Sequence, residues 1–163
     1  MNVLLINGSP HAHGCTDAAL QEIAKALNAD GIETTIYHIG AVPVGGCVGC
    51  GGCSKAGKCV FGGPVADVLP LVEKADGIVF GAPVHYATAA ASMLGFMHRL
   101  AISGGKYLRH KPAAVVTSAR RAGTTTALEA MEKVPQFFEM PLISSTYWPM
   151  VHGGKAEEVL SDD

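Results

Sequence analysis

Short apolar runs alternate along this chain with longer stretches in which apolar residues recur every three or four positions. The short runs, each about five residues long, predict buried strands at residues 2–6, 34–39, 76–81, 113–117 and 142–146. The longer stretches predict amphipathic helices at residues 16–29, 65–74, 89–102 and 124–138. In the first helix Leu20, Ile23 and Leu27 share one face, and Gly31 follows as a stop signal.

Alternating strands and helices indicate right-handed βαβ units around a parallel sheet that is covered on both faces. Five strands favour an α/β three-layer sandwich of flavodoxin-like order 2-1-3-4-5 over a six-stranded dinucleotide fold. The chain ends at residues 157–163, where a fifth covering helix would begin. We therefore expect this C-terminal helix to be absent from the chain, or a partner subunit to cover that side of the sheet.

Composition narrows the class of protein. The 163 residues suit a single domain, 1–163, and the hydrophobic share of 48% is enough for a sizeable core. A net charge of −2 gives no overall attraction to nucleic acid or to anionic lipid. The apolar runs are too short to cross a bilayer, and the N-terminus lacks the basic start of a secretion signal. We expect a cytoplasmic protein with no membrane or nucleic-acid partner.

Ligands of open α/β sheets bind beyond the carboxyl ends of the strands, so the first loop there, residues 7–16, is a candidate site. This loop suits a phosphate monoester, because its small residues let the backbone curl and Ser9 and Thr16 offer hydroxyls. The N-terminus of the helix that follows adds free N–H groups. The alternative is an ordinary turn in which Thr16 caps the helix. A nucleoside-triphosphate loop is excluded because no G-x-x-x-x-G-K-[ST] is present, and Cys15 lacks the arginine that a cysteine phosphatase needs.

Two further loops are expected at the same edge. Residues 82–86 contain Pro83 and Tyr86, which suit a planar heterocycle, although Tyr86 packing on the third helix is the alternative. Residues 118–126 contain Arg120 and an adjacent arginine, which offer donors to ring carbonyls or form a solvated charge pair. Together the three loops fit one ligand with a phosphate, a polyol-like linker and a flat ring.

The segments NGSPHAHGCT, GAPVHYAT and SARRAGTT resemble the three flavin-binding loops of the NADPH-dependent FMN reductase superfamily, whose fold is flavodoxin-like. The resemblance implies FMN as cofactor. The positions that it implies for the phosphate are Ser9, His11, Cys15 and Thr16, those beside the ring are Pro83, Val84, His85 and Tyr86, and those at its other edge are Ser118, Arg120 and Gly123. The family usually has Arg at the position of His11 and Asn at that of Cys15, so we expect looser FMN binding that depends on pH.

Four of the five cysteines form the motif Cys47-x2-Cys50-x2-Cys53-x5-Cys59, inside a glycine-rich loop, residues 45–62, between the second strand and the second helix. Three closely spaced thiolates and a fourth suit a [4Fe–4S] cluster. Tetrahedral zinc, and free or disulfide-forming thiols, are the alternatives. The motif resembles the iron–sulfur flavoprotein branch of the same superfamily.

The resemblance implies an oxidoreductase that passes electrons from NAD(P)H through FMN to a small-molecule or protein acceptor, with no side chain as general base. Arg120 would then tune the flavin. The alternative is an electron carrier that uses a [4Fe–4S] cluster and a ferredoxin-like partner, without nicotinamide. A third hypothesis is a non-catalytic sensor or zinc module. We also expect a homo-oligomer, either a dimer or a tetramer.

Overall fold

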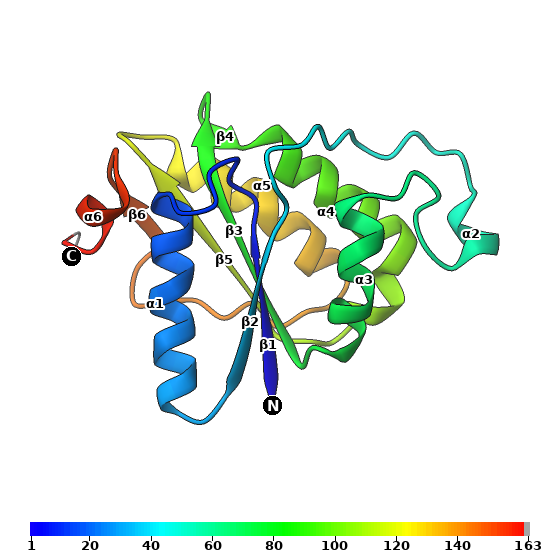
Figure 1. Ribbon diagram of the computed structural model, residues 1–163, viewed down its shortest axis with the longest axis horizontal. Helices are drawn as coiled ribbons and strands as arrows, with labels where there is room; N and C mark the ends of the chain where they lie inside the picture. Colours follow the sequence, from blue (N-terminus) through cyan, green and yellow to red (C-terminus); the bar gives the residue numbers. More distant parts are fainter. Residues whose placement is uncertain (162–163) are drawn as a thin grey trace.

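The computed structural model describes residues 1–161 and contains a sheet whose main path runs β2-β1-β3-β5-β6. Neighbouring strands on this path are parallel, and the short β4 pairs antiparallel with the end of β3. The predicted order 2-1-3-4-5 is therefore confirmed for the parallel strands, as Figure 1 shows. The strands are β1 (Asn2–Asn7), β2 (Glu33–His38), β3 (Gly77–His85), β4 (Thr88–Ala89), β5 (Ala113–Ala119) and β6 (Met150–His152).

Helices cover both faces of the sheet, as predicted. In Figure 1, α1 and α6 lie on one side, and α3, α4 and α5 lie on the other. The short α2 belongs to the cysteine loop, which extends away from the sheet. The helices are α1 (Cys15–Ala29), α2 (Cys53–Ala56), α3 (Pro64–Lys74), α4 (Ala91–Gly104), the 3₁₀ helix η1 (Gly105–Tyr107), α5 (Thr124–Phe137) and α6 (Ala156–Val159). Within residues 1–161, no helix has the length and apolar character needed to cross a membrane.

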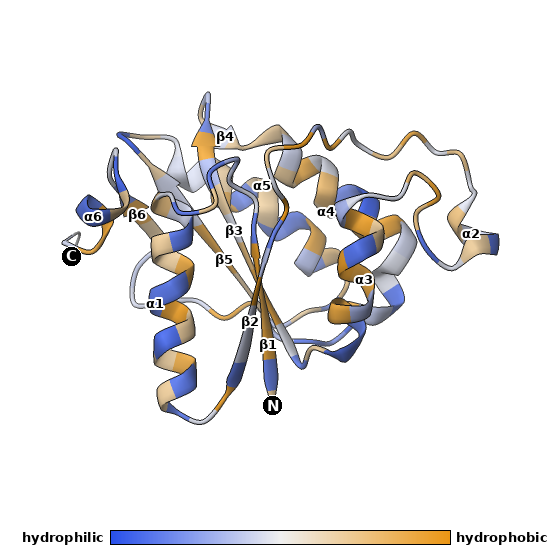
Figure 2. Ribbon diagram, in the orientation of Figure 1, coloured by the Kyte–Doolittle hydropathy of each residue, from blue (hydrophilic) through white to orange (hydrophobic). Residues whose placement is uncertain are grey.

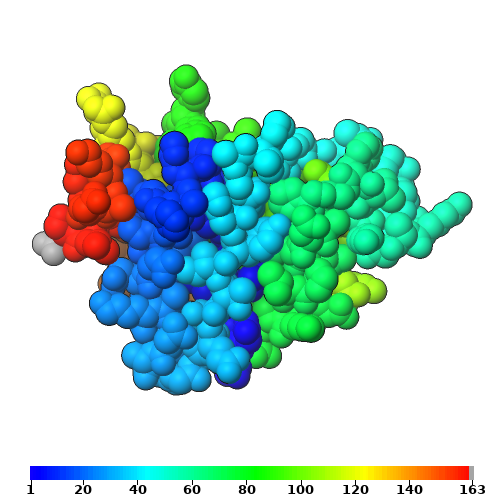
Figure 3. Space-filling view, in the orientation of Figure 1, coloured from blue at the N-terminus to red at the C-terminus, as the bar shows by residue number. Residues whose placement is uncertain are grey.

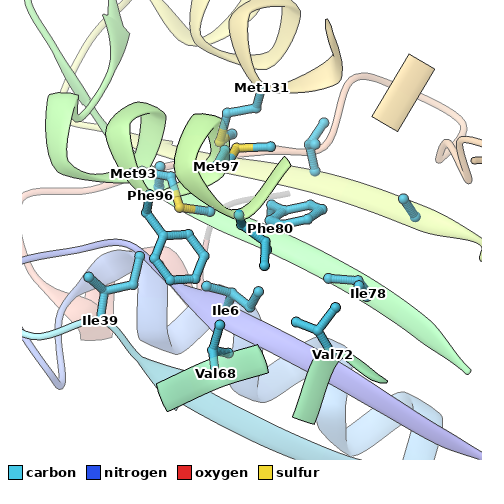
Figure 4. Packing of buried hydrophobic residues seen from close by; sticks show 14 of the residues in the cluster. Ile6, Ile39, Val68, Val72, Ile78, Phe80, Met93, Phe96, Met97 and Met131 are labelled. Atoms are coloured by element: carbon cyan, nitrogen blue, oxygen red, sulfur yellow. The ribbon is translucent and has the colours of Figure 1, made fainter. Parts of the chain in front are cut away.

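The sheet separates two apolar cores of unequal size. Successive strand residues point to opposite faces, so that Leu5 belongs to the smaller core beside α1 whereas Ile6 belongs to the larger one. In the larger core Ile6 and Phe80 from the strands pack with Phe96 of α4, all fully buried (Figure 4). Figure 2 shows that the strands are mostly apolar, whereas the helices carry both polar and apolar residues.

The prediction of a strand at residues 142–146 is wrong. That segment contributes one isolated bridge, between Leu142 and Ala113, and Ile143 is 59% exposed. The last strand is β6, where Met150 packs against the larger core and Val151 against the smaller one. The strand forms at Met150 and Val151 because their side chains pack on both faces of the sheet. Leu142 and Ile143 are followed by exposed serines and do not extend into a strand.

The expected absence of a C-terminal helix also needs correction. Residues 156–159 form α6, a single turn that lies beside α1. Its Val159 is only 5% exposed and joins Leu20 in the smaller core. A short helix of four residues thus covers part of the sheet where the sequence predicts that no helix is present.

Candidate functional site

A cavity of about 800 Å³ opens at the carboxyl ends of β1, β3, β5 and β6. Its walls come from four separate loops. One of them, after β6, lies against the segment that follows β1, as the red and dark blue atoms of Figure 3 show. The lining residues are 9–16, 83–85, 118–120 and 153–157. All the predicted flavin residues line this cavity except Tyr86 and Gly123.

The loop after β1 is held close to the sheet by its glycine. The Gly8 N–H donates to the carbonyl of Gly81 on β3 at 2.8 Å. A Cβ atom at position 8 would lie 2.8 Å from the Cβ of Met93, which belongs to α4. Because real Cβ contacts are never that short, only glycine allows the chain to leave β1 at this point.

Internal hydrogen bonds fix the rest of this loop. The buried Asn7 side chain accepts from the Ser9 N–H at 3.0 Å, and Ser9 Oγ accepts from the His11 N–H at 3.1 Å. On the outer side, His38 Nε2 donates to the Ser9 carbonyl at 2.8 Å. The Nδ2 group of Asn7 also donates to Asp17 in the first turn of α1, at 3.3 Å. The loop therefore has a defined shape before any ligand arrives.

The alternative in which Thr16 caps α1 is wrong. The N-cap is Gly14, and no side chain caps this helix. Thr16 Oγ1 instead lies 2.8 Å from Ser118 Oγ on β5, and both side chains are buried. The N–H groups of the first turn of α1 are thus left without a capping side chain at the cavity wall, where they favour an anion.

Cys15 faces the loop after β6, a segment that the sequence analysis did not assign to the site. Its thiol donates to the Gly153 carbonyl at 3.4 Å. Burial raises the pKa of this thiol above 9.0; a backbone hydrogen bond opposes the rise, and Glu158 and Glu157 add to it. Residues 153–157 were missed because the last strand was predicted too early, which hid the fact that they follow a strand end.

Tyr86 and Gly123 do not line the cavity, contrary to the prediction. Tyr86 is fully exposed at the tip between β3 and β4, with φ of 51°, so the alternative of packing on the following helix is also wrong. Gly123 lies beneath this tip with φ of 92°, where a Cβ would meet the Ala87 Cα at 2.6 Å. Gly123 therefore supports the tip through close backbone packing.

Charged side chains lie at one end of the cavity. Arg120 lines it as predicted, and its neighbour Arg121 does not. An adjoining hollow of about 500 Å³ is bordered by Arg120, Lys155 and Glu158. Lys155 was not predicted, for the same reason as the rest of its loop. Glu157 also lines the cavity, so this end of the site carries side chains of both charges.

Comparison with known proteins decides the family. The profile of the NADPH-dependent FMN reductase family matches residues 1–155. The chain belongs to this family. An iron-sulfur flavoprotein of Methanocaldococcus jannaschii is 32% identical over 132 residues, which are 79% of this chain and 68% of the relative. One of Clostridioides difficile is 25% identical over 137 residues, which are 82% of this chain and 61% of the relative.

This member of the FMN reductase family therefore spans about two thirds of the length of these two relatives. Among solved structures, a flavodoxin from the domain Archaea superposes with a TM-score of 0.65 at 14% identity, over 99% of this chain and 90% of the flavodoxin. Similarity at that identity shows the fold, which is flavodoxin-like.

The cysteine motif of this FMN reductase family member surrounds a second cavity, of about 210 Å³. All four motif cysteines line it, together with residues of α4, and none of its lining residues belongs to the first cavity. Cys47 and Cys50 are exposed, whereas Cys53 and Cys59 are half-buried. In the described part of the chain, no three His, Cys, Asp or Glu side chains converge closely enough to hold a metal ion.

Proposed function

We propose that this chain binds FMN in the 800 Å³ cavity and acts as an FMN-dependent oxidoreductase. One observation carries the proposal: three loops with flavin-family motifs meet at the carboxyl ends of neighbouring parallel strands, around a cavity of ligand size. The fit is chemical as well as spatial. One wall offers free N–H groups and hydroxyls for a phosphate, and another offers apolar residues for a ring.

The phosphate would be held at the start of α1. Residues 8–16 contain no lysine or arginine, so the attraction comes from backbone N–H groups, the helix dipole, and the hydroxyls of Ser9 and Thr16. His11 and His13 are the side chains of this loop that can add positive charge. This supports the expectation of looser FMN binding than is usual in the family, because neutral donors bind a dianion less strongly than a guanidinium does.

The flavin ring would lie between residues 83–85 and residues 118–120. When bound, FMN supplies the redox chemistry, by accepting a hydride and passing on its electrons. The protein's part is to exclude water from one ring face with Pro83 and Val84 and to place Arg120 at the edge that gains negative charge. Arg120 is free to do this because it forms no ion pair within the described chain.

We propose NAD(P)H as the hydride donor. The adjoining hollow between Arg120 and Lys155 supports this, because two cations beside a flavin cavity suit a phosphate-bearing co-substrate. Because Glu158 lies on the same border, the phosphate would have to lie on the side of Arg120 and Lys155.

An Arg120→Ala variant tests the role of this residue. We expect the rate of flavin reduction by NADPH to fall about tenfold or more, since one charge-assisted contact is worth about 1.5–3 kcal/mol, whereas the FMN Kd changes less than threefold. Arg121→Ala is the matched control, because Arg121 is adjacent and does not line the cavity. Equal, small effects of Arg120→Ala on both quantities would overturn the assignment.

A second candidate function is that of an electron carrier with a [4Fe–4S] cluster. The observation in its favour is that Cys47, Cys50, Cys53 and Cys59 line one cavity, with the thiolate donors that iron–sulfur clusters use. Gly49, Gly51 and Gly57 adopt positive φ with no heavy atoms near a Cβ position, which leaves the loop room to gather the thiolates. A ferredoxin-like protein would then supply the electrons.

The two candidates are separated by an absorption spectrum of anaerobically purified and reconstituted protein, with iron measured on the same sample. Flavin bands without iron would support the reductase and leave the cysteines as thiols. Flavin bands over a broad shoulder, with about four irons per chain, would support the carrier. Zinc without any flavin would overturn both.

A further inference from the structure

Asp17 places a carboxylate behind the loop that we propose as a phosphate site. It stands in the first turn of α1, it is only 9% exposed, and it does not line the cavity. A negative charge in the first turn stabilises a helix, but here it also repels a phosphate bound at the same helix end. The contacts of this side chain indicate what it provides in return.

The carboxylate of Asp17 holds the amide of Asn7 in one orientation. Its Oδ1 atom accepts from the Asn7 Nδ2 group at 3.3 Å. An ionised carboxylate only accepts hydrogen bonds, so it pairs with the nitrogen end of an amide and not with the oxygen end. The Asn7 oxygen therefore faces the Ser9 N–H, which donates to it at 3.0 Å. Because Asn7 is fully buried, bulk water does not compete for either end of this amide.

The orientation of Asn7 reaches the cavity wall through Ser9. The Ser9 Oγ atom accepts from the His11 N–H at 3.1 Å, which leaves its own O–H group to donate to a ligand. Ser9 lines the cavity, whereas Asn7 and Asp17 lie behind it. If the amide of Asn7 turned over, its nitrogen would meet the Ser9 N–H, and two donors would face each other. The backbone at Ser9 would then have to move, and its hydroxyl with it.

We propose that Asp17 is a positioning residue for the FMN phosphate, which acts through Asn7 and Ser9 without touching the phosphate. This rests on the proposed binding of FMN in the first cavity. Removal of the carboxylate has two opposite effects, because it takes away a repulsive charge and also frees the Asn7 amide to turn. Asparagine at position 17 separates these effects, since it is neutral while its Oδ1 atom can still accept from the Asn7 Nδ2 group.

The test compares the binding of FMN and of riboflavin, which lacks the phosphate, to the full-length apoprotein by quenching of flavin fluorescence. The riboflavin Kd divided by the FMN Kd measures the selectivity for the phosphate. We expect Asp17→Ala to lower this ratio at least about threefold, as the loss of one ordering hydrogen bond would, and Asp17→Asn to keep the wild-type ratio or exceed it. Glu22→Ala is the matched control, because it removes an exposed carboxylate from the same helix. It should change the ratio less than about twofold.

Several results would overturn the role of Asp17. A wild-type ratio in both Asp17 variants would mean that the carboxylate only stabilises α1, and a higher ratio in both would mean that it acts by repulsion alone. An equal loss in both would show that the charge matters and the orientation of Asn7 does not. If Asp17→Ala fails to fold, Asp17→Ser decides, because its side chain ends one atom nearer the backbone, and a wild-type ratio in that variant overturns the role. If the wild-type chain binds FMN no more tightly than riboflavin, the phosphate site itself is wrong.

Discussion

Thr16 and Ser118 join the two halves of the first cavity through a single buried hydrogen bond. The two hydroxyl oxygens lie 2.8 Å apart, although the residues are 102 positions apart in the chain. Thr16 stands in the first turn of α1, where we place the phosphate, and Ser118 lies near the end of β5, where we place the ring edge. The bond therefore fixes the separation of two loops of the candidate site without any ligand.

Thr16→Val should lower the free energy of unfolding by about 1–2 kcal/mol, because it leaves the buried Ser118 hydroxyl without its partner. The double variant with Ser118→Ala should lose less than the sum of the single variants, as expected for groups in direct contact. Urea denaturation of all three proteins measures this. Thr125→Val, at an exposed site on α5, should change stability by under about 0.5 kcal/mol. Additive losses would contradict a coupling between Thr16 and Ser118.

Gly123→Ala should destabilise the tip between β3 and β4 and weaken FMN binding. The added Cβ would lie 2.6 Å from the Ala87 Cα, and φ at this position is 92°. Gly40→Ala is the matched control, because φ there is 91° and no heavy atom lies within 4 Å of its Cβ position. Both substitutions incur conformational strain of about 1 kcal/mol, but only Gly123→Ala adds the collision. Equal midpoints of urea denaturation for the two variants would show that the close approach is unimportant.

The stability of the apoprotein should fall more steeply between pH 8 and 10 in the wild type than in Cys15→Ala. Burial raises the pKa of this thiol above its ordinary value of 9.0, so the folded chain holds the proton more tightly than the unfolded chain does. Above pH 9 the unfolded chain is the first to release its proton, and this favours unfolding until the folded thiol ionises too. Urea denaturation under reducing conditions measures the slopes. Cys15→Ser should behave like Cys15→Ala, and the same slope in all three proteins would refute the prediction.

His11→Arg should tighten FMN binding, because it places a permanent charge and a fork of donors in a loop that has no arginine or lysine. We expect the Kd at pH 8 to fall about threefold to tenfold, on the basis of about 1 kcal/mol for a partly exposed charge-assisted contact. Quenching of flavin fluorescence measures it. In the control His13→Arg, the side chain starts 93% exposed and close to Asp17, so the gain should be smaller. A riboflavin titration, which lacks the phosphate, should show no gain for His11→Arg.

Most of the fold follows from the sequence because its strands are local apolar runs with turn signals at both ends. The main exception is the last strand, which is predicted at residues 142–146 and which the structure has at β6, with Met150 and Val151. The position of this strand depends on which segment is buried on both faces of the sheet, and residues far away in the chain decide that. The same error concealed Gly153 and Lys155 from the predicted site.

The candidate site follows from the sequence only where a loop directly follows a strand. Ser9, Pro83 and Ser118 were found in this way, and the structure brings them to one cavity. Tyr86 was assigned by residue type, but its position at the tip of a turn sends its side chain into solvent. The contact between Arg99 and Cys59 joins residues 40 positions apart on unrelated elements, so no local pattern could predict it.

The cysteine loop, residues 45–62, is a part of the chain that can change in length during evolution. It leaves the sheet after β2 and returns at α3, and its only helix is the four-residue α2. Doubling the length of such a connection costs about 0.6 kcal/mol in closure entropy, so insertions and deletions here hardly affect the sheet. A lineage can therefore acquire, lengthen or discard a cysteine-rich segment at this position while the cavity at the strand ends stays intact. The loop and the cavity are free to evolve at different rates.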